Sequence, residues 1–141
     1  MFITASMRPI SHQFVMVTVA ERQRLIRLTD IREIVSLMAL AEVEGRRDRC
    51  RGMANLRGEM IPVFDLSGPD TPLSPTRMIV VAHAFGDTVG LLVDDVHDVV
   101  AVPEDRVALR PVGGGRAATV VRLGDEIFSV MEVADAVRDD G

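Results

Sequence analysis

Short runs of apolar and β-branched residues, each ended by turn-forming residues, recur along the whole chain. The first two, residues 13–20 (QFVMVTVA) and 24–29 (RLIRLT), are separated by a short polar segment, which predicts a β-hairpin. The next segment, residues 30–43 (DIREIVSLMALAEV), fits a helix as well as a strand. Asp30 and Glu33 form a capping pattern, so we expect a short helical turn between them that leads into a strand.

The centre of the chain has the clearest hairpin signal. Strands over about residues 52–56 and 59–66 flank a turn at Arg57 and Gly58. Gly58 supplies the backbone freedom that a tight turn requires. Pro62 has no backbone N–H, so its strand is expected to lie at a sheet edge or to be bulged there.

The second half repeats the pattern. Further strands are expected at residues 77–84, 88–94, 96–102, 118–123 and 126–131. Residues 67–76 contain three prolines and one glycine, which predict an exposed loop and the boundary between two subdomains. Residues 110–116 predict a flexible loop, and residues 132–139 predict a short C-terminal helix.

This pattern is typical of an all-β protein. About nine short strands joined by tight turns predict barrels or sandwiches. The lack of strand–helix alternation argues against a sheet that binds a dinucleotide. The length of 141 residues fits one domain over residues 1–141, with an N-terminal arm over about residues 1–12.

Composition narrows the function classes. The net charge of -5 argues against nucleic acid as a partner, because binding to phosphates requires a basic surface. All 16 basic residues are arginine, which excludes a Schiff-base lysine and the lysine of a phosphate-binding P-loop. The start of the chain lacks a secretory signal, and the apolar runs are too short to cross a bilayer, so we expect a cytoplasmic protein without direct membrane insertion.

Candidate catalytic and metal-binding residues are few. Asp94, Asp95, His97 and Asp98 are close in sequence, but side chains alternate along a strand, so only Asp95 and His97 would share a face. Cys50 stands among arginines, which would favour a thiolate, yet no base accompanies it. We therefore expect an exposed cysteine without a catalytic role. The sequence predicts neither an enzyme nor a bound metal or cofactor.

Two motifs resemble those of a known family. The segment GMANLRGEMIPVFDL (residues 52–66) is similar to the first signature of CheW-like chemotaxis coupling domains, G-V-x-N-L-R-G-x-x-I-P-V-x-D-L. The segment VGLLVDDVHDVVAVPEDRV (residues 89–107) resembles the second, V-G-x-x-V-D-x-V-x-D-V. The resemblance extends over about residues 13–137.

The resemblance implies a fold and a role. The fold would be two small SH3-like five-stranded β-barrels packed together, with short helical turns and a short C-terminal helix. The role would be a non-enzymatic adaptor that couples methyl-accepting chemoreceptors to a CheA-type histidine kinase in membrane-associated arrays. In this family the helical tip of the receptor lies in the groove between the barrels, and the regulatory domain of the kinase docks end to end on a barrel.

The resemblance also implies a receptor-binding groove. Its residues here would be Glu33, Ile34, Asn55, Arg57, Gly58, Val89, Val93 and Val96. Within this set, Arg57 is expected to pair with Glu33 near the groove. Asn55, Gly58 and Asp65 are expected mainly to build the turn.

Two segments depart from the family pattern. Residues 42–51 are rich in arginine, and residues 67–75 replace a basic helical stretch. Because these segments lie on surfaces that would contact the kinase, kinase binding is predicted to be weaker than receptor binding. The alternatives are a modulator that binds receptor but not kinase, an SH3-like interaction module outside chemosensing, and a small metal-dependent enzyme that uses Asp95 and His97.

Overall fold

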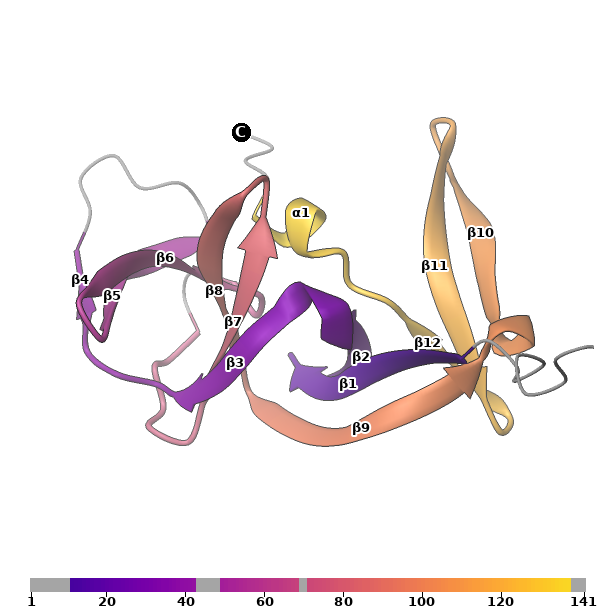
Figure 1. Ribbon diagram of the computed structural model, residues 1–141, viewed down its shortest axis with the longest axis horizontal. Coiled ribbons are helices and arrows are strands. Elements are labelled where there is room, and N and C mark those ends of the chain that lie inside the picture. The colour runs from indigo at the N-terminus through magenta and orange to yellow at the C-terminus, as the bar shows by residue number, and fades with distance from the viewer. Residues whose placement is uncertain (1–10, 43–48, 69–70, 138–141) are drawn as a thin grey trace, which may run out of the picture.

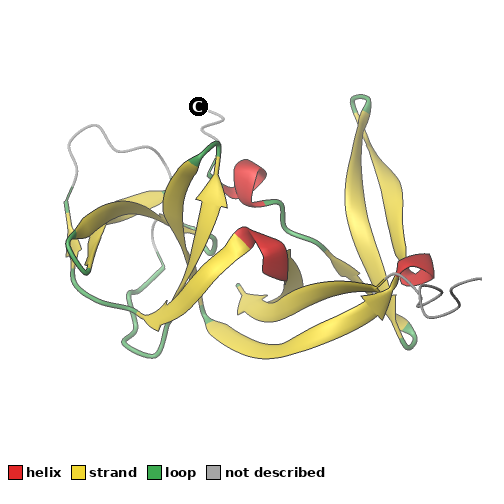
Figure 2. Cartoon of the chain, in the orientation of Figure 1, coloured by secondary structure: helices red, strands yellow, loops and turns green. Residues whose placement is uncertain are grey.

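The computed structural model describes residues 11–42, 49–68 and 71–137, and most of these residues lie in β-strands (Figures 1 and 2). The strands are β1 (Ser11–Val19), β2 (Arg22–Arg27), β3 (Ile31–Ser36), β4 (Leu40–Ala41), β5 (Cys50–Leu56), β6 (Glu59–Asp65), β7 (Met78–Ala84), β8 (Asp87–Val93), β9 (Asp95–Pro103), β10 (Val107–Gly113), β11 (Arg116–Leu123) and β12 (Glu126–Ser129). The helical elements are the 3₁₀ turns η2 (Leu28–Asp30) and η3 (Glu104–Arg106) and the short helix α1 (Val133–Ala136). The predicted all-β class is confirmed.

The strands form three sheets. One has six strands in the order β3-β7-β8-β6-β5-β4, with β6 and β8 parallel. The other two have three strands each, β2-β1-β9 and β10-β11-β12. A parallel bridge between Leu25 and Val130 joins these two smaller sheets. Figure 1 shows β9 running between the six-stranded sheet on one side and β10–β12 on the other.

Each half has its own apolar interior. The six-stranded sheet curls around a cluster that includes Leu56, Ile61 and Leu92. The two smaller sheets enclose a second cluster around Phe14 and Leu25. The pairings among the described strands do not close a ring in either half, and their numbers differ from the expected five strands per barrel.

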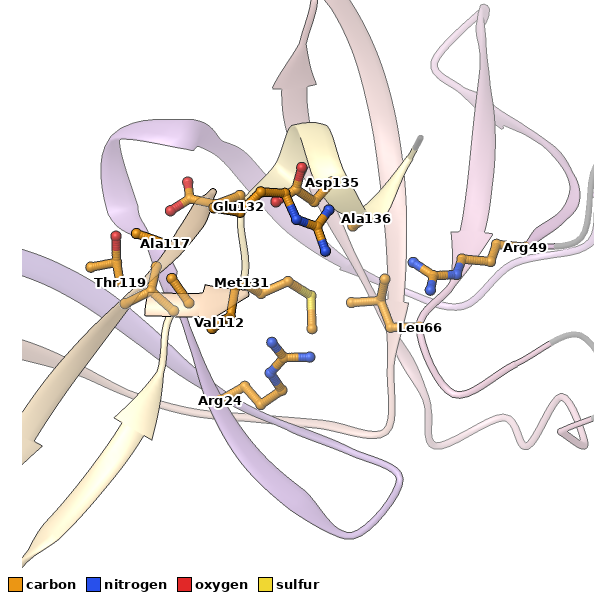
Figure 3. A pocket seen from close by; sticks show the side chains of 13 residues that line it. Arg24, Arg49, Leu66, Val112, Ala117, Thr119, Met131, Glu132, Asp135 and Ala136 are labelled. Atoms are coloured by element: carbon orange, nitrogen blue, oxygen red, sulfur yellow. The ribbon is translucent and has the colours of Figure 1, made fainter. Parts of the chain in front are cut away.

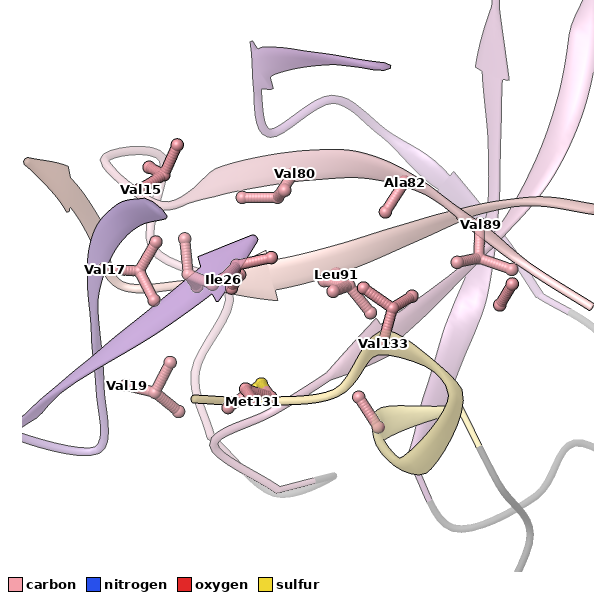
Figure 4. Close-up of a cluster of buried hydrophobic side chains, with 13 residues drawn as sticks. Val15, Val17, Val19, Ile26, Val80, Ala82, Val89, Leu91, Met131 and Val133 are labelled. Atoms are coloured by element: carbon pink, nitrogen blue, oxygen red, sulfur yellow. The ribbon is translucent and has the colours of Figure 1, made fainter. Parts of the chain in front are cut away.

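A third and larger cluster lies between the halves. It contains alternate residues of β1, β7 and β8, together with residues around α1 (Figure 4). Its buried members are Val15, Val17, Val19, Ile26, Val80, Ala82, Ala84, Val89, Leu91, Val93, Met131, Val133 and Ala136. β7 and β8 are therefore covered on both faces, which explains why MIVVA and VGLLV read as continuous apolar runs.

Several expectations need correction. The short helical turn expected over residues 30–33 is the 3₁₀ turn η2, which ends at Asp30. Residues 31–33 already belong to β3. The expected loop over residues 110–116 is the end of β10, a glycine turn and the start of β11. Its glycines adopt positive φ values, which let a tight turn form between paired strands. The expected helix over residues 132–139 is limited to Val133–Ala136 among the described residues.

The chain changes sheets elsewhere than expected. The loop over residues 67–76 joins β6 to β7, and both belong to the six-stranded sheet. The chain enters this sheet after η2 and leaves it at Asp94, between β8 and β9. β6 is not an edge strand, because β5 and β8 pair with it on either side. Pro62 is tolerated since the ladder to β8 begins only at Val63.

Gly90 gives the fold a tight point of contact in the second signature motif. A Cβ atom there would lie 2.9 Å from Ile79 Cγ2 and 3.1 Å from Val63 Cγ2. We expect Gly90→Ala to lower the free energy of unfolding by about 1–3 kcal/mol, because overpacking forces neighbouring strands apart. Urea denaturation measures this change. An unchanged unfolding midpoint would show that β6 and β7 can shift at no cost.

Candidate functional site

The signature hairpin between β5 and β6 has a two-residue turn. Leu56 pairs with Glu59, and the two residues between them have φ values of 52° at Arg57 and 90° at Gly58. Positive φ at both positions is typical of a type I′ turn, which matches the twist of a hairpin. The Gly58 N–H donates to Asn55 Oδ1 at 2.8 Å. Asn55 and Gly58 therefore build the turn that presents the Arg57 side chain.

Arg57 pairs with Glu33, as the resemblance implied. Its Nη2 lies 2.5 Å from Glu33 Oε2, and 63% of the Arg57 side chain is exposed. Among the described residues this is the one hydrogen bond that Arg57 makes, so the pair is not bidentate. The remaining guanidinium N–H groups face no acceptor of the described chain and are available to a partner.

Two more charges extend this pair into a small cluster. Arg32 Nε lies 3.3 Å from Glu33 Oε2, and Arg32 Nη1 donates to Glu59 Oε1 at 3.0 Å. Arg32 and Glu33 belong to β3, at one end of the six-stranded order, whereas Arg57 and Glu59 belong to the hairpin near the other end. The contacts therefore exist because the sheet curls, and they join its two ends by charge.

The pair keeps both partners ionised. The hydrogen bond from Arg57 lowers the pKa of Glu33, with further lowering by the positive charges of Arg57 and Arg32 and an opposing effect of burial. The same contact raises the pKa of Arg57. Because the pKa of Glu33 lies below its ordinary value, the pair is intact at neutral pH and is lost only as the pH falls through that lowered pKa.

The apolar residues of the predicted groove lie in or against the cluster between the halves. Val93 has no exposed surface, and Val89 is 5% exposed. Ile34 and Val96 are partly buried and pack against the same cluster. Val89 and Val93 are therefore core residues beneath the groove rather than exposed residues. The role of all four residues in receptor binding stays a prediction.

A buried ionic network does not follow from the sequence pattern. Asp65 is fully buried and accepts two hydrogen bonds from Arg77, at 2.7 Å and 3.0 Å, and a third from Arg51 at 2.6 Å. Arg77 Nε also lies 3.1 Å from Asp94 Oδ1. The expectation that Asp65 builds the signature turn is wrong, because Asp65 lies at the opposite end of β6 from that turn. A buried aspartate predicts a cationic partner, but sequence alone does not say which arginine supplies it.

This network organises the loop between β6 and β7. Arg51 Nη1 donates to the Thr71 carbonyl oxygen at 2.8 Å, and Asp65 Oδ1 accepts from the Ser67 N–H at 2.9 Å. On the other side, Asp94 Oδ2 accepts from the Ala20 N–H at 2.8 Å. The charges therefore connect the loop to the β1–β2 turn, and their role is structural.

The candidate catalytic and metal residues do not assemble. Asp94 belongs to the buried network, whereas His97 Nε2 lies 2.6 Å from Thr18 Oγ1. Within residues 11–42, 49–68 and 71–137 no three histidine, cysteine, aspartate or glutamate side chains gather closely enough to hold a metal ion. Cys50 is 8% exposed, which corrects the expectation of an exposed cysteine, and its thiol donates to the Gly52 carbonyl oxygen.

Comparison with known families connects this geometry to a class of protein. A family model described as the CheW-like domain matches residues 13–140, which is most of the chain. The chain belongs to the CheW-like domain family. Arg57 of the first signature and Glu33, paired in the structure, both lie inside the matched region.

Individual relatives agree with this membership. The CheW-like chain is 31% identical to the probable chemotaxis protein CheW of Rhizobium etli, over 60% of this chain and 63% of the relative. It is 30% identical to the chemotaxis protein CheW of Bacillus subtilis, over 65% of this chain and 62% of the relative. The matched region thus spans under two thirds of the length of these curated relatives.

A solved structure shows the same fold. The crystal structure of the scaffolding protein TtCheW from Thermoanaerobacter tengcongensis has a TM-score of 0.80 with this CheW-like chain, at 22% identity. The match covers 95% of this chain and 92% of that one. It confirms the SH3-like CheW fold that the resemblance implied. No helix in the described part of the chain is long and apolar enough to cross a membrane.

Proposed function

We propose that this chain is a non-enzymatic adaptor of a bacterial chemosensory pathway, which couples the cytoplasmic tip of a chemoreceptor to a CheA-type histidine kinase. Membership of the CheW-like family supports this proposal, as do relatives named as chemotaxis proteins. The proposed location is the cytoplasmic side of receptor arrays. No residue is proposed to catalyse a reaction or to hold a cofactor.

The Glu33–Arg57 pair is the observation that carries the receptor-binding part of the proposal. The fold brings together two residues 24 positions apart, and the turn holds Arg57 at the surface with unused N–H donors. A planar guanidinium with free donors can bind carboxylate or carbonyl oxygens of a receptor helix while it stays paired with Glu33. Ile34 and Val96, partly buried beside the central cluster, would supply apolar contacts.

An exposed apolar surface continues from this charged cluster. A cavity of about 420 Å³ is lined by Glu59, Met60 and Phe85, among others. Met60 is 49% exposed and Phe85 is 72% exposed, although both are large apolar side chains. Apolar surface of this kind, bordered by charges, is typical of protein–protein contact rather than of a catalytic site.

Kinase binding is proposed to be the weaker of the two interactions. The arginine-rich segment over residues 42–51 would place charges such as that of the exposed Arg49 at the contact, and charges that lose water without gaining partners oppose docking. Arg51 of this segment does not contribute, because it is paired with Asp65. Residues 43–48 of this segment lie outside the described residues. A protein that binds receptor but not kinase would modulate an array rather than complete it.

Separate binding experiments test the proposal. The purified chain is titrated with a receptor-tip fragment and, independently, with a kinase regulatory domain. We expect clear binding of the receptor tip and weaker or undetectable binding of the kinase domain. Equal sub-micromolar affinity for a typical kinase domain would refute the proposed weakness. Failure to bind receptor tips would instead favour an SH3-like interaction module outside chemosensing.

A further inference from the structure

A second cavity lies away from the Glu33–Arg57 surface and shares no residue with it (Figure 3). Its volume is about 380 Å³. One side is formed by the β10–β11 hairpin and the other by the region around α1 and Leu66. The lining residues are Arg24, Arg49, Leu66, Val112, Arg116, Ala117, Ala118, Thr119, Val130, Met131, Glu132, Asp135 and Ala136.

Three arginines from separate elements line this cavity. Arg24 belongs to β2, Arg49 precedes β5 and Arg116 begins β11. None of the three has an ion pair or side-chain hydrogen bond with another residue in the described part of the chain. Arg24 is partly buried, whereas Arg49 and Arg116 are exposed. Arg51 and Arg77, whose side chains have little exposed surface, differ because they are paired with carboxylates.

The acidic residues of the lining do not balance these charges. Glu132 already accepts a hydrogen bond from Arg27, which itself lies outside the lining. Asp135 has an interaction of its own and contributes one negative charge. Burial, with repulsion from Arg22 and Arg49, lowers the pKa of Arg24. The cavity therefore keeps excess positive charge in a chain whose net charge is -5.

Apolar side chains separate the arginines. Figure 3 shows Arg24 and Arg49 on different sides of Leu66, with Met131 close to Arg24. Val112, on the β10–β11 hairpin, is 54% exposed although it lines the cavity. Met131 is largely buried, so the uncovered apolar part of the lining comes mainly from Val112 and the partly buried Leu66. The lining thus combines cationic groups with exposed apolar surface.

We propose that this cavity is a docking site for an acidic segment of a partner protein, in which carboxylate side chains bind the three arginines and an apolar side chain contacts Leu66 and Val112. This interaction goes beyond receptor coupling and does not depend on it. Guanidinium groups bind carboxylates with strong, charge-assisted hydrogen bonds. An unpaired, half-buried arginine lowers stability, and retention of such a group is typical of a functional site.

The arrangement of the lining favours a peptide over a small anion. A cavity of this volume, within the roughly 300–1,000 Å³ of ligand sites, holds several side chains. Inorganic phosphate could bind the arginines but would leave the apolar surface uncovered. A segment that alternates acidic and apolar side chains meets both requirements.

Fluorescence anisotropy with a labelled peptide of alternating glutamate and leucine tests this site. The comparison peptide has glutamine at every glutamate position. The test variant is Arg24→Gln with Arg49→Gln, and the matched control is Arg110→Gln with Arg122→Gln. The control removes the same charge from exposed arginines that do not line the cavity. If the double variant does not fold, the single variant Arg49→Gln, at an exposed position, still tests the site.

We expect the wild type and the control variant to bind the glutamate peptide alike, and the test variant to bind at least about tenfold more weakly because charge-assisted bonds are lost. The glutamine peptide should bind poorly to all. The melting temperature of the test variant should be unchanged or higher, since Arg24 is unpaired among the described residues.

Four outcomes would overturn the proposal. These are no binding of the glutamate peptide to wild type, equal loss in the test and control variants, equal binding of both peptides, and full competition by millimolar inorganic phosphate. Vesicles of phosphatidylglycerol provide a further comparison. If they bind in an Arg24- and Arg49-dependent manner while the peptide does not, the cavity recognises an anionic lipid surface instead.

Discussion

Asp65→Asn is expected to lower the free energy of unfolding by about 3–5 kcal/mol, because it leaves buried arginines without their shared anion. Arg77 and Arg51 both bind the Asp65 carboxylate, and Arg77 is 3% exposed. Asparagine has nearly the same shape as aspartate, but it has no charge and only one side-chain oxygen. It therefore cannot replace the two carboxylate oxygens of Asp65 as hydrogen-bond acceptors. Asp94 remains near Arg77 but is 32% exposed and contacts a different guanidinium nitrogen.

Chemical denaturation measures this effect, and Asp98→Asn is the matched control. Asp98 is exposed and has no hydrogen bond or ion pair within the described residues, so its replacement should change stability by less than about 0.5 kcal/mol. The loop over residues 67–76 should also become more sensitive to protease in Asp65→Asn, since Arg51 and Ser67 connect it to Asp65. Similar stability of both variants would show that the network contributes little to folding.

Arg57→Ala is expected to weaken binding of a receptor tip at least about tenfold, because truncating an arginine at an interface often removes much of the binding energy. The melting temperature should stay nearly unchanged. The exposed pair with Glu33 contributes little to folding. The positive φ of this position costs alanine about as much as arginine, so the turn itself is not altered. Isothermal titration calorimetry with a receptor-tip fragment measures the affinity.

Three further variants separate the side chain from the turn. Arg57→Asn suits the type I′ turn, so it should fold at least as well as wild type and still bind weakly. Glu33→Ala should weaken binding too, and the double variant Glu33→Ala with Arg57→Ala should cost less than the two single effects together. Arg110→Ala, at an exposed site on β10, should bind normally. Unfolding of Arg57→Ala, or unchanged receptor affinity, would assign Arg57 to the turn alone.

Most local elements of this protein are determined by its sequence. Apolar runs such as MIVVA form strands because they are short, β-branched and bounded by turn residues. The pair Arg57–Gly58 forms a tight turn, and the Gly58 N–H is satisfied by the nearby Asn55 side chain. These features depend on residues within a few positions of each other, so a sequence pattern is enough to predict them.

Local patterns gave a wrong prediction where strand pairing outweighed the loop propensity of the residues. Pro111 and the glycines after it are typical of a loop, yet Pro111 lies opposite Ala117 in the β10–β11 ladder. The glycines provide the positive φ values of the turn, while the strands on either side are held by their mutual hydrogen bonds. Pairing partners are chosen by the whole fold, which a local pattern does not contain.

The tertiary structure alone decided which charges meet. Arg77 binds Asp65 and Asp94 because the loop after β6 returns to the start of β7, and Arg24, Arg49 and Arg116 share a cavity although they are far apart in sequence. Motif resemblance could suggest the Glu33–Arg57 pair, but the curl of the six-stranded sheet brings the two side chains into contact. Long-range charge contacts depend on sheet order and curvature, and neither follows from the alternation of apolar and polar residues.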